Sequence, residues 1–181
     1  MSDTPAGLEA LDYTFTGLNP AGSFAPVLVG VVGGGLLLLR PGWVGGRLAP
    51  EARELMRAVA LSVMDGLWPA PGAAREASLQ AHLERLDTQI AGYPAAVRAE
   101  LSQVLALLTR SGGRLALVGL TPDWPNATVT EVQEALNDMR VSRLAMRQQI
   151  YRALRELNCI AFFTAPDHWA LTGYPGPREI P

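Results

Sequence analysis

The fold class follows from residues 128–163, TVTEVQEALNDMRVSRLAMRQQIYRALRELNCIAFF. It opens with a capping-box pattern, in which the side chains of Thr128 and Glu131 each accept a hydrogen bond from the other's backbone N–H. Apolar residues then recur at spacings of three and four, the period of a helix that buries one face. The pattern predicts one helix after Thr128 and a longer one over about 142–163. Their inward positions are Val132, Leu136, Met139, Met146, Ile150, Leu154, Leu157 and Ala161.

Three further helices are predicted upstream by the same spacing. Pro50 suits the first turn of one, Gly92 ends the second, Pro94 opens the third and Gly112-Gly113 end it. The apolar LALVGL at 115–120 is too short to assign. No stretch alternates apolar and polar residues, so the prediction is an all-α bundle of about five helices without a sheet. The inward positions are Leu55, Met56, Val59, Val63, Leu67, Leu79, Leu83, Leu86, Ile90, Val97, Leu101, Val104, Leu105 and Leu108.

The amino-acid composition excludes several classes of protein. The chain has 181 residues, of which 49% are hydrophobic and 18% charged, which fits one helical domain and excludes a disordered, highly charged chain. Net charge is −2, so no global attraction to nucleic acid is expected. All 15 basic residues are arginine, which excludes lysine Schiff bases and a phosphate-binding loop that needs lysine.

Side chains that could carry chemistry are few. Cys159 is the single cysteine, so no disulfide forms within the chain. His82 and His168 cannot make a zinc site with one cysteine unless carboxylates join them. A Cys159–His168 nucleophile pair beside Asp167 would suit a hydrolase, but the thiol falls inside an apolar helix and is predicted to be buried and inert. No catalytic, cofactor-binding or metal-binding residue is therefore predicted.

The first 46 residues are predicted to form a region separate from the helical domain, which covers 47–181. Residues 1–23 are polar and acidic and are expected to be a flexible arm. Residues 24–39, FAPVLVGVVGGGLLLL, form an uncharged, mostly apolar run that Arg40 ends. An export signal, a membrane anchor and a buried segment remain alternatives, because the run is short for a spanning helix and no positive charge precedes it.

An arginine cluster lies across the last two predicted helices. It is either a basic face for an anionic partner or a set of charges neutralised by the acidic helix before it; the second interpretation is favoured because the chain carries no overall positive charge. The arginines are Arg140, Arg143, Arg147, Arg152 and Arg155, and the acids are Glu131, Glu134 and Asp138.

Aromatic residues gather in the last third of the chain and are the candidate partner-binding residues. The C-terminal tail FFTAPDHWALTGYPGPREIP is rich in proline, so it is predicted to be extended. Such a tail either packs on its own bundle or docks on a partner. The candidates are Trp124, Phe162, Phe163, Trp169, Tyr174 and Pro175.

Three segments together resemble a known family. They are LAPEARELMRAVALSVMDGLWPAP from residue 48, GLTPDWPNATV from residue 119 and RVSRLAMRQQIYRALRELNCIAFFTAPDHWALTGYPGP from residue 140. They are similar to the small, subunit-3-like (gamma) chain of bacterial FAD-dependent gluconate, sugar and alcohol dehydrogenases. The resemblance covers about residues 47–177, and the aromatic FFTAPDHWALTGYPGP is its sharpest part.

The resemblance implies a helical accessory chain that is not catalytic and holds no cofactor. Such a chain would bind a large flavoprotein of the glucose–methanol–choline type, aid its folding and FAD loading, and accompany it to the periplasm. A cytochrome c subunit can then take the electrons. Family members commonly begin with a twin-arginine leader, whereas the first arginine here, Arg40, follows the apolar run. A free-standing helical protein, anchored in a membrane through residues 24–39, is the alternative function.

Overall fold

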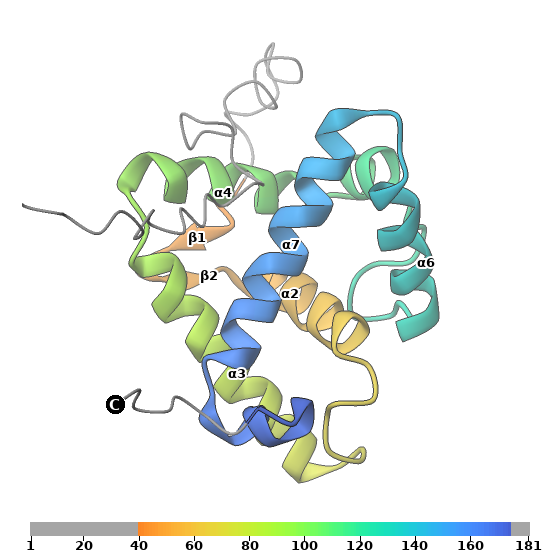
Figure 1. Ribbon diagram of the computed structural model, residues 1–181. Coiled ribbons are helices and arrows are strands. Elements are labelled where there is room, and N and C mark those ends of the chain that lie inside the picture. The colour runs from red at the N-terminus through yellow and green to blue at the C-terminus, as the bar shows by residue number, and fades with distance from the viewer. Residues whose placement is uncertain (1–39, 175–181) are drawn as a thin grey trace, which may run out of the picture.

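The computed structural model describes residues 40–174, which form an all-α bundle (Figure 1). A short helical turn, α5 (Ser111–Gly113), a π-helical segment, η2 (Arg114–Val118), and a 3₁₀ helix, η3 (Pro166–Thr172), accompany five longer helices. The predicted fold class and the five long helices are confirmed, whereas the apolar run 24–39 lies outside the described residues. The long helices are α2 Pro50–Val63, α3 Ala73–Ala91, α4 Ala95–Leu108, α6 Val129–Arg140 and α7 Ala145–Phe163.

A small β-hairpin precedes the bundle, so the prediction of no sheet is wrong at this one place. Strand β1 (Trp43–Val44) pairs antiparallel with β2 (Arg47–Leu48). Gly45 and Gly46 join them with φ angles of 59° and 83°. Two consecutive positive φ angles define the turn that matches the twist of a two-residue hairpin, and glycine adopts them without strain. Strands of two residues are too short for an alternating pattern to reveal.

The chain at the start of the hairpin packs against α4. The backbone N–H of Gly42 donates to the Ser102 carbonyl oxygen at 3.1 Å. A Cβ added to Gly42 would lie 2.5 Å from the Cβ of Leu105, so this close approach of two backbones requires glycine. The folded body therefore includes residues 42–46, which lie before the predicted domain boundary at residue 47.

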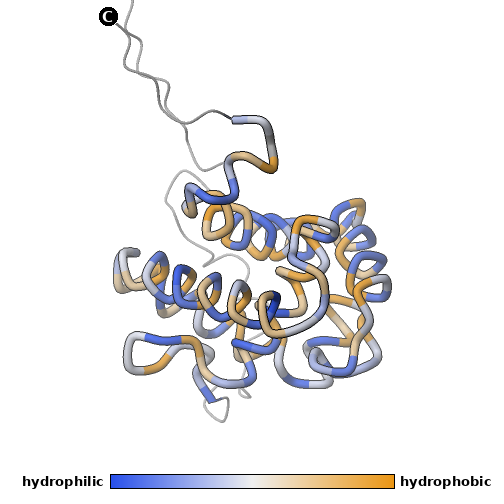
Figure 2. Tube along the Cα trace, turned by 90° about the horizontal axis from the view of Figure 1, so that it is seen from below, coloured by the Kyte–Doolittle hydropathy of each residue, from blue (hydrophilic) through white to orange (hydrophobic). Residues whose placement is uncertain are grey.

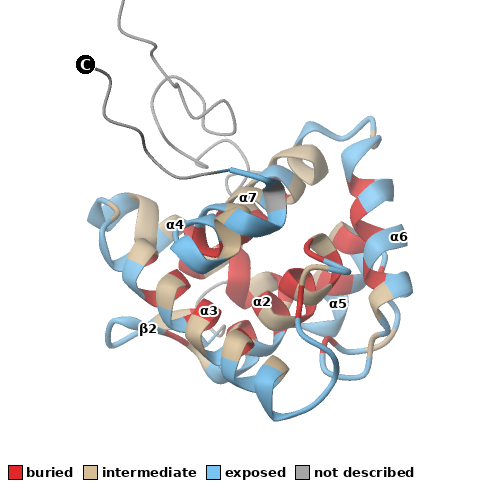
Figure 3. Ribbon diagram, turned by 60° about the horizontal axis from the view of Figure 1, so that its bottom comes forward, coloured by how far each residue is buried: buried red, intermediate tan, exposed pale blue. Residues whose placement is uncertain are grey.

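Helix α2 is the centre of the bundle. It packs against α3, α6 and α7, and its buried positions lie inside the molecule in Figure 3. Pro50 stands at its start, as the sequence predicts, and Glu51 lies in its first turn. Both suit a helix N-terminus, where proline loses no hydrogen bond and a carboxylate meets the positive end of the helix dipole.

The α3–α4 junction follows the prediction, but the end of α4 does not. Gly92 caps α3 and Pro94 caps the start of α4. Helix α4 ends at Leu108, and Gly112-Gly113 lie in the following helical turn instead of ending the helix. The chain passes so close to α4 there that a Cβ on Gly113 would overlap the Leu107 carbonyl group. Gly113 is therefore a glycine because two backbones pass close together, and not because the helix ends there. The sequence pattern is the same in both cases.

Helices α6 and α7 confirm the two helices predicted for residues 128–163. The Thr128 hydroxyl accepts from the Glu131 N–H at 3.3 Å, and the Glu131 carboxylate accepts from the Thr128 N–H at 2.8 Å. Helix α7 begins at Ala145 instead of 142, because the Ser142 hydroxyl accepts from the N–H of Leu144 and forms a turn first.

The core lies where the apolar faces of the helices meet. Figure 2 shows apolar and polar residues alternating around each helix, as expected of amphipathic helices. One cluster joins α2, α3, α4, α6 and α7, and a smaller one surrounds Trp68 and Phe162 at the other end of α2. Within residues 40–174, no helix is long and apolar enough to cross a membrane.

Candidate partner-binding surface

The six predicted partner-binding residues fall into three groups. Phe163 and Tyr174 are exposed by 38% and 50%, and Trp169 is half-buried. Trp124 and Phe162 are buried, and Pro175 lies outside the described residues. The structure therefore brings Phe163, Trp169 and Tyr174 together at the C-terminal end of α7, and we call these three residues the C-terminal aromatic cluster.

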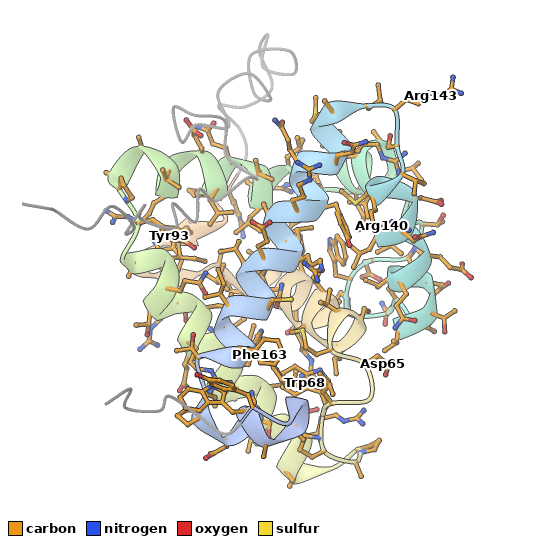
Figure 4. The ribbon with its side chains drawn as sticks, viewed as in Figure 1. Asp65, Trp68, Tyr93, Arg140, Arg143 and Phe163 are labelled. Carbon is orange, nitrogen blue, oxygen red and sulfur yellow. The ribbon has the colours of Figure 1, made fainter. Side chains whose placement is uncertain are left out.

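The C-terminal aromatic cluster is held by local hydrogen bonds. The indole N–H of Trp169 donates to the Phe163 carbonyl oxygen at 2.8 Å. The rings of Trp169 and Tyr174 meet edge to face, with centroids 5.5 Å apart. Figure 4 shows Phe163 at the end of α7 with the side chains of η3 beside it. Because these contacts orient the rings of Trp169 and Tyr174 in the folded chain, burying those two rings against another surface would cost little side-chain entropy.

The prediction of an extended tail is wrong over residues 166–172. These residues form η3, which starts at Pro166 and ends at Thr172; Gly173 follows with a φ of 70°. Proline's fixed φ suits an extended chain and the first turn of a helix equally well, so its presence did not discriminate between them. The helical turn folds the tail back and brings the rings of Trp169 and Tyr174 into contact.

Trp124 and Phe162 belong to the core of the chain, which corrects their prediction as partner anchors. Trp124 is 3% exposed, and its indole N–H donates to the Leu108 carbonyl oxygen at 2.9 Å. It thereby fastens the loop before α6 to the end of α4. Phe162 is fully buried. Phe162 therefore offers no surface to a partner, and Trp124 offers only the small exposed part that lines the groove described below.

A buried aromatic cluster surrounds Phe162. Its ring meets Trp68 edge to face at 5.2 Å between centroids and stacks on His168 at 3.9 Å. His82 completes the cluster, and its Nε2 lies 3.0 Å from Oδ1 of Asn158. Burial lowers the pKa of His82 to about 4, against the hydrogen bond to Asn158, which raises it. His82 is therefore neutral at pH 7.

Sequence reasoning missed this polar pair. His82 lies among the apolar positions of α3, between Leu79 and Leu86, and Asn158 lies next to Leu157 in α7. A polar residue inside an apolar stripe is the signal that could have revealed it. A buried polar group needs a partner, and a pair across two helices supplies one.

The suggested Cys159–His168 nucleophile pair is not supported by the contacts of either residue. The His168 Nδ1 lies 2.7 Å from the Phe162 carbonyl oxygen, and its ring stacks on Phe162. Burial raises the pKa of the Cys159 thiol, which disfavours the reactive thiolate. Among residues 40–174, no three histidine, cysteine or acidic side chains could hold a metal ion together.

A groove of about 1150 Å³ runs past the hairpin, α2, α3 and the loop of Trp124. At its floor the Asp87 carboxylate accepts from the Leu48 N–H at 2.8 Å and pairs with Arg53 at 2.9 Å. The Arg114 guanidinium, also lining it, donates to the carbonyl oxygens of Leu120 and Thr121. These charged side chains hold the hairpin and the loop in place, so their contacts give them a structural role in the fold.

The expected neutralisation of the arginine cluster by α6 is not seen. In the described part of the chain the two ion pairs are Arg53–Asp87 and Arg57–Glu76, and neither involves α6 or α7. Arg147 instead turns inward and donates to the Leu117 and Val118 carbonyl oxygens at 2.8 and 3.2 Å. The exposed members of the cluster are Arg140, Arg143, Arg152 and Arg155.

Comparisons with known proteins add little to this geometry. No family model matches the chain, and no solved structure matches it. A stretch of 33 residues is 67% identical to the malonate decarboxylase acyl carrier protein of Burkholderia cepacia. That stretch covers 18% of this chain and 31% of the acyl carrier protein, so the similarity spans less than a third of that protein.

Proposed function

We propose that this chain is the non-catalytic small subunit of a bacterial FAD-dependent sugar or alcohol dehydrogenase complex. FAD and the chemistry would belong to a large flavoprotein of the glucose–methanol–choline type. The small subunit would bind that flavoprotein, help it fold around FAD and accompany it to the periplasm. A cytochrome c subunit would accept the electrons, and residues 24–39 would add a membrane contact.

The C-terminal aromatic cluster is the observation that carries the proposal. Phe163 and Tyr174 expose large apolar surfaces, and Leu171 beside them is 52% exposed. Aromatic residues that stay partly exposed on a folded chain and are held in place are the usual anchors of protein interfaces. The cluster also lies within the FFTAPDHWALTGYPGP segment, which carries the sharpest part of the family resemblance.

Co-expression with a large flavoprotein of the glucose–methanol–choline type from the same genome tests the proposal. A tag on the flavoprotein should recover both chains together, with FAD measured by its visible absorbance. Cutting a buried interface anchor to alanine costs about 2 kcal/mol or more, which is roughly a thirtyfold weaker complex. Trp169→Ala should therefore lower recovery of the FAD-loaded complex by about that factor.

Leu115→Ala is the matched control, because Leu115 is 59% exposed but lies on η2, against α4 and α6. It should leave recovery unchanged. A flavoprotein that is purified alone, carries a full complement of FAD and never binds this chain would refute the proposal.

A further inference from the structure

A second, polar surface lies on the same helix as the aromatic cluster. A groove of about 200 Å³ runs between α2, α6 and α7. Arg140, at the end of α6, and Arg155, on α7, both line it, together with Tyr151 and Gln133. Two arginines from different helices thus line one shallow hollow, and we call it the arginine groove.

The arginine groove carries two arginines, and one carboxylate is bonded to its lining: Oδ2 of Asp65 accepts from the Gln133 side chain at 3.4 Å. None of the side chains that line it is a carboxylate. Arg140 donates through Nε and Nη2 to the Asn137 side-chain oxygen at 3.3 and 2.8 Å, a neutral partner that orients the guanidinium and leaves its charge. The two ion pairs of the described region lie elsewhere and leave Arg155 without a carboxylate.

Helical geometry connects the arginine groove to the C-terminal aromatic cluster. Arg155, Cys159 and Phe163 follow one another at intervals of four residues, so they lie along one face of α7. Eight residues of helix span about 12 Å. One face of α7 therefore presents a positive hollow and, about 12 Å further along, an exposed phenylalanine ring.

We propose that the arginine groove binds the carboxylate of an acidic segment of the partner flavoprotein. That segment places an acidic side chain about 12 Å from an apolar one, which covers Phe163. Arginine suits this role because its planar, permanently charged group can bind a carboxylate through two parallel hydrogen bonds. The identity of the partner rests on the proposed function above, whereas the preference for a carboxylate rests on the groove alone.

The first experiment tests the groove on the full chain by itself, with hexaglutamate as the probe in an NMR titration. Wild-type protein should bind the peptide, and Arg155→Glu and Arg140→Glu should each weaken binding about tenfold. Arg143→Glu is the matched control, since Arg143 is exposed, precedes the same helix and extends away from the bundle in Figure 4. It should change the affinity less than about twofold. Equal losses for Arg155→Glu and Arg143→Glu would overturn the proposal.

The second experiment measures the complex with the flavoprotein at rising salt. Arg155→Glu should weaken it about tenfold and flatten its salt dependence, whereas Arg143→Glu should not. If wild-type protein forms the complex and the two variants behave alike, the arginine groove is not the contact and this inference fails, while the proposed function stands. If wild-type protein forms no complex but hexaglutamate binds as expected, the proposed function fails and the carboxylate site stands.

The chain's own acidic residues are the competing occupant. If deleting residues 1–23 raises the affinity for hexaglutamate about tenfold, and Arg155→Glu leaves the flavoprotein complex unchanged, then the groove holds this chain's own arm. That combination would overturn the assignment to a partner.

Discussion

Phe162 and Phe163 are neighbours of the same chemistry, and truncating each should give opposite results. The Phe162 ring is fully buried between Trp68 and His168, whereas the Phe163 ring is 38% exposed. Cutting a core phenylalanine to alanine removes its buried surface and leaves a cavity, at a cost of about 3–5 kcal/mol. A chain of this size loses about 2–4 °C of melting temperature per kcal/mol, so Phe162→Ala should lower it by about 6–20 °C.

Phe163→Ala should instead act on the partner. Phe163 is 38% exposed and its ring meets that of Phe162 edge to face, so the loss of folding stability should be about 1–2 kcal/mol, below that of Phe162→Ala. Binding of the flavoprotein should fall roughly thirtyfold, the effect of removing an interface anchor of about 2 kcal/mol. Phe162→Ala chains that remain folded should lose less affinity than Phe163→Ala, because the Phe162 ring supports Phe163 and His168 from inside but exposes no surface itself.

Circular dichroism melts and pull-down yields on the same two variants separate these effects. The bundle's helical signal before melting should be unchanged in Phe163→Ala. The reasoning would be refuted if Phe163→Ala lowered the melting temperature as much as Phe162→Ala, because the exposed ring would then be part of the core. It would also be refuted if Phe163→Ala left the pull-down yield unchanged.

Three further predictions concern single side chains. The pKa of His82 is about 4 in the folded chain and 6.5 when the side chain is in water, as in the unfolded chain. Between pH 4 and pH 6.5 the unfolded state therefore binds more protons than the folded state. Stability should therefore fall by about 1 kcal/mol from pH 7 to pH 5.5, and His82→Leu should flatten that part of the pH dependence of the melting temperature. Thr128→Ala removes the capping box and should lower stability by about 1 kcal/mol in a denaturant titration. Burial raises the pKa of Cys159, so iodoacetamide should alkylate this thiol more slowly at pH 7 than it alkylates free cysteine. Rapid alkylation of the folded chain would contradict that expectation. Cys159→Ser should leave assembly with the flavoprotein intact.

Features that depend on neighbouring residues could be predicted from the sequence. The Thr128–Glu131 capping box needs residues only three apart, and both of its hydrogen bonds are present. Helical spacing identified most inward positions of α2, α3, α4, α6 and α7, because amphipathic periodicity is set along one helix. Val63, Val97 and Met146 are only half-buried, and Leu67 lies beyond the end of α2. The hairpin escaped prediction because its pairing rests on two glycines and two residues per strand, a pattern too short to stand out.

The candidate site depended on contacts between distant residues, which sequence patterns do not contain. Arg147 and Arg155 are both arginines of α7, yet Arg147 bonds to carbonyl oxygens of η2 while Arg155 faces a groove formed with α6. Their difference arises from where α7 lies against its neighbours.

Local sequence was enough to predict that this chain forms amphipathic helices, some of the helix boundaries, at Pro50, Gly92, Pro94 and Thr128, and which aromatic residues gather late in the chain. Only the tertiary structure decided that Trp124 and Phe162 face inward while Phe163 and Tyr174 face outward. Adjacent residues on a helix point about 100° apart. Which of Phe162 and Phe163 is buried is therefore fixed by the rotation of α7 against α2 and α3, a choice made by the packing of the whole core.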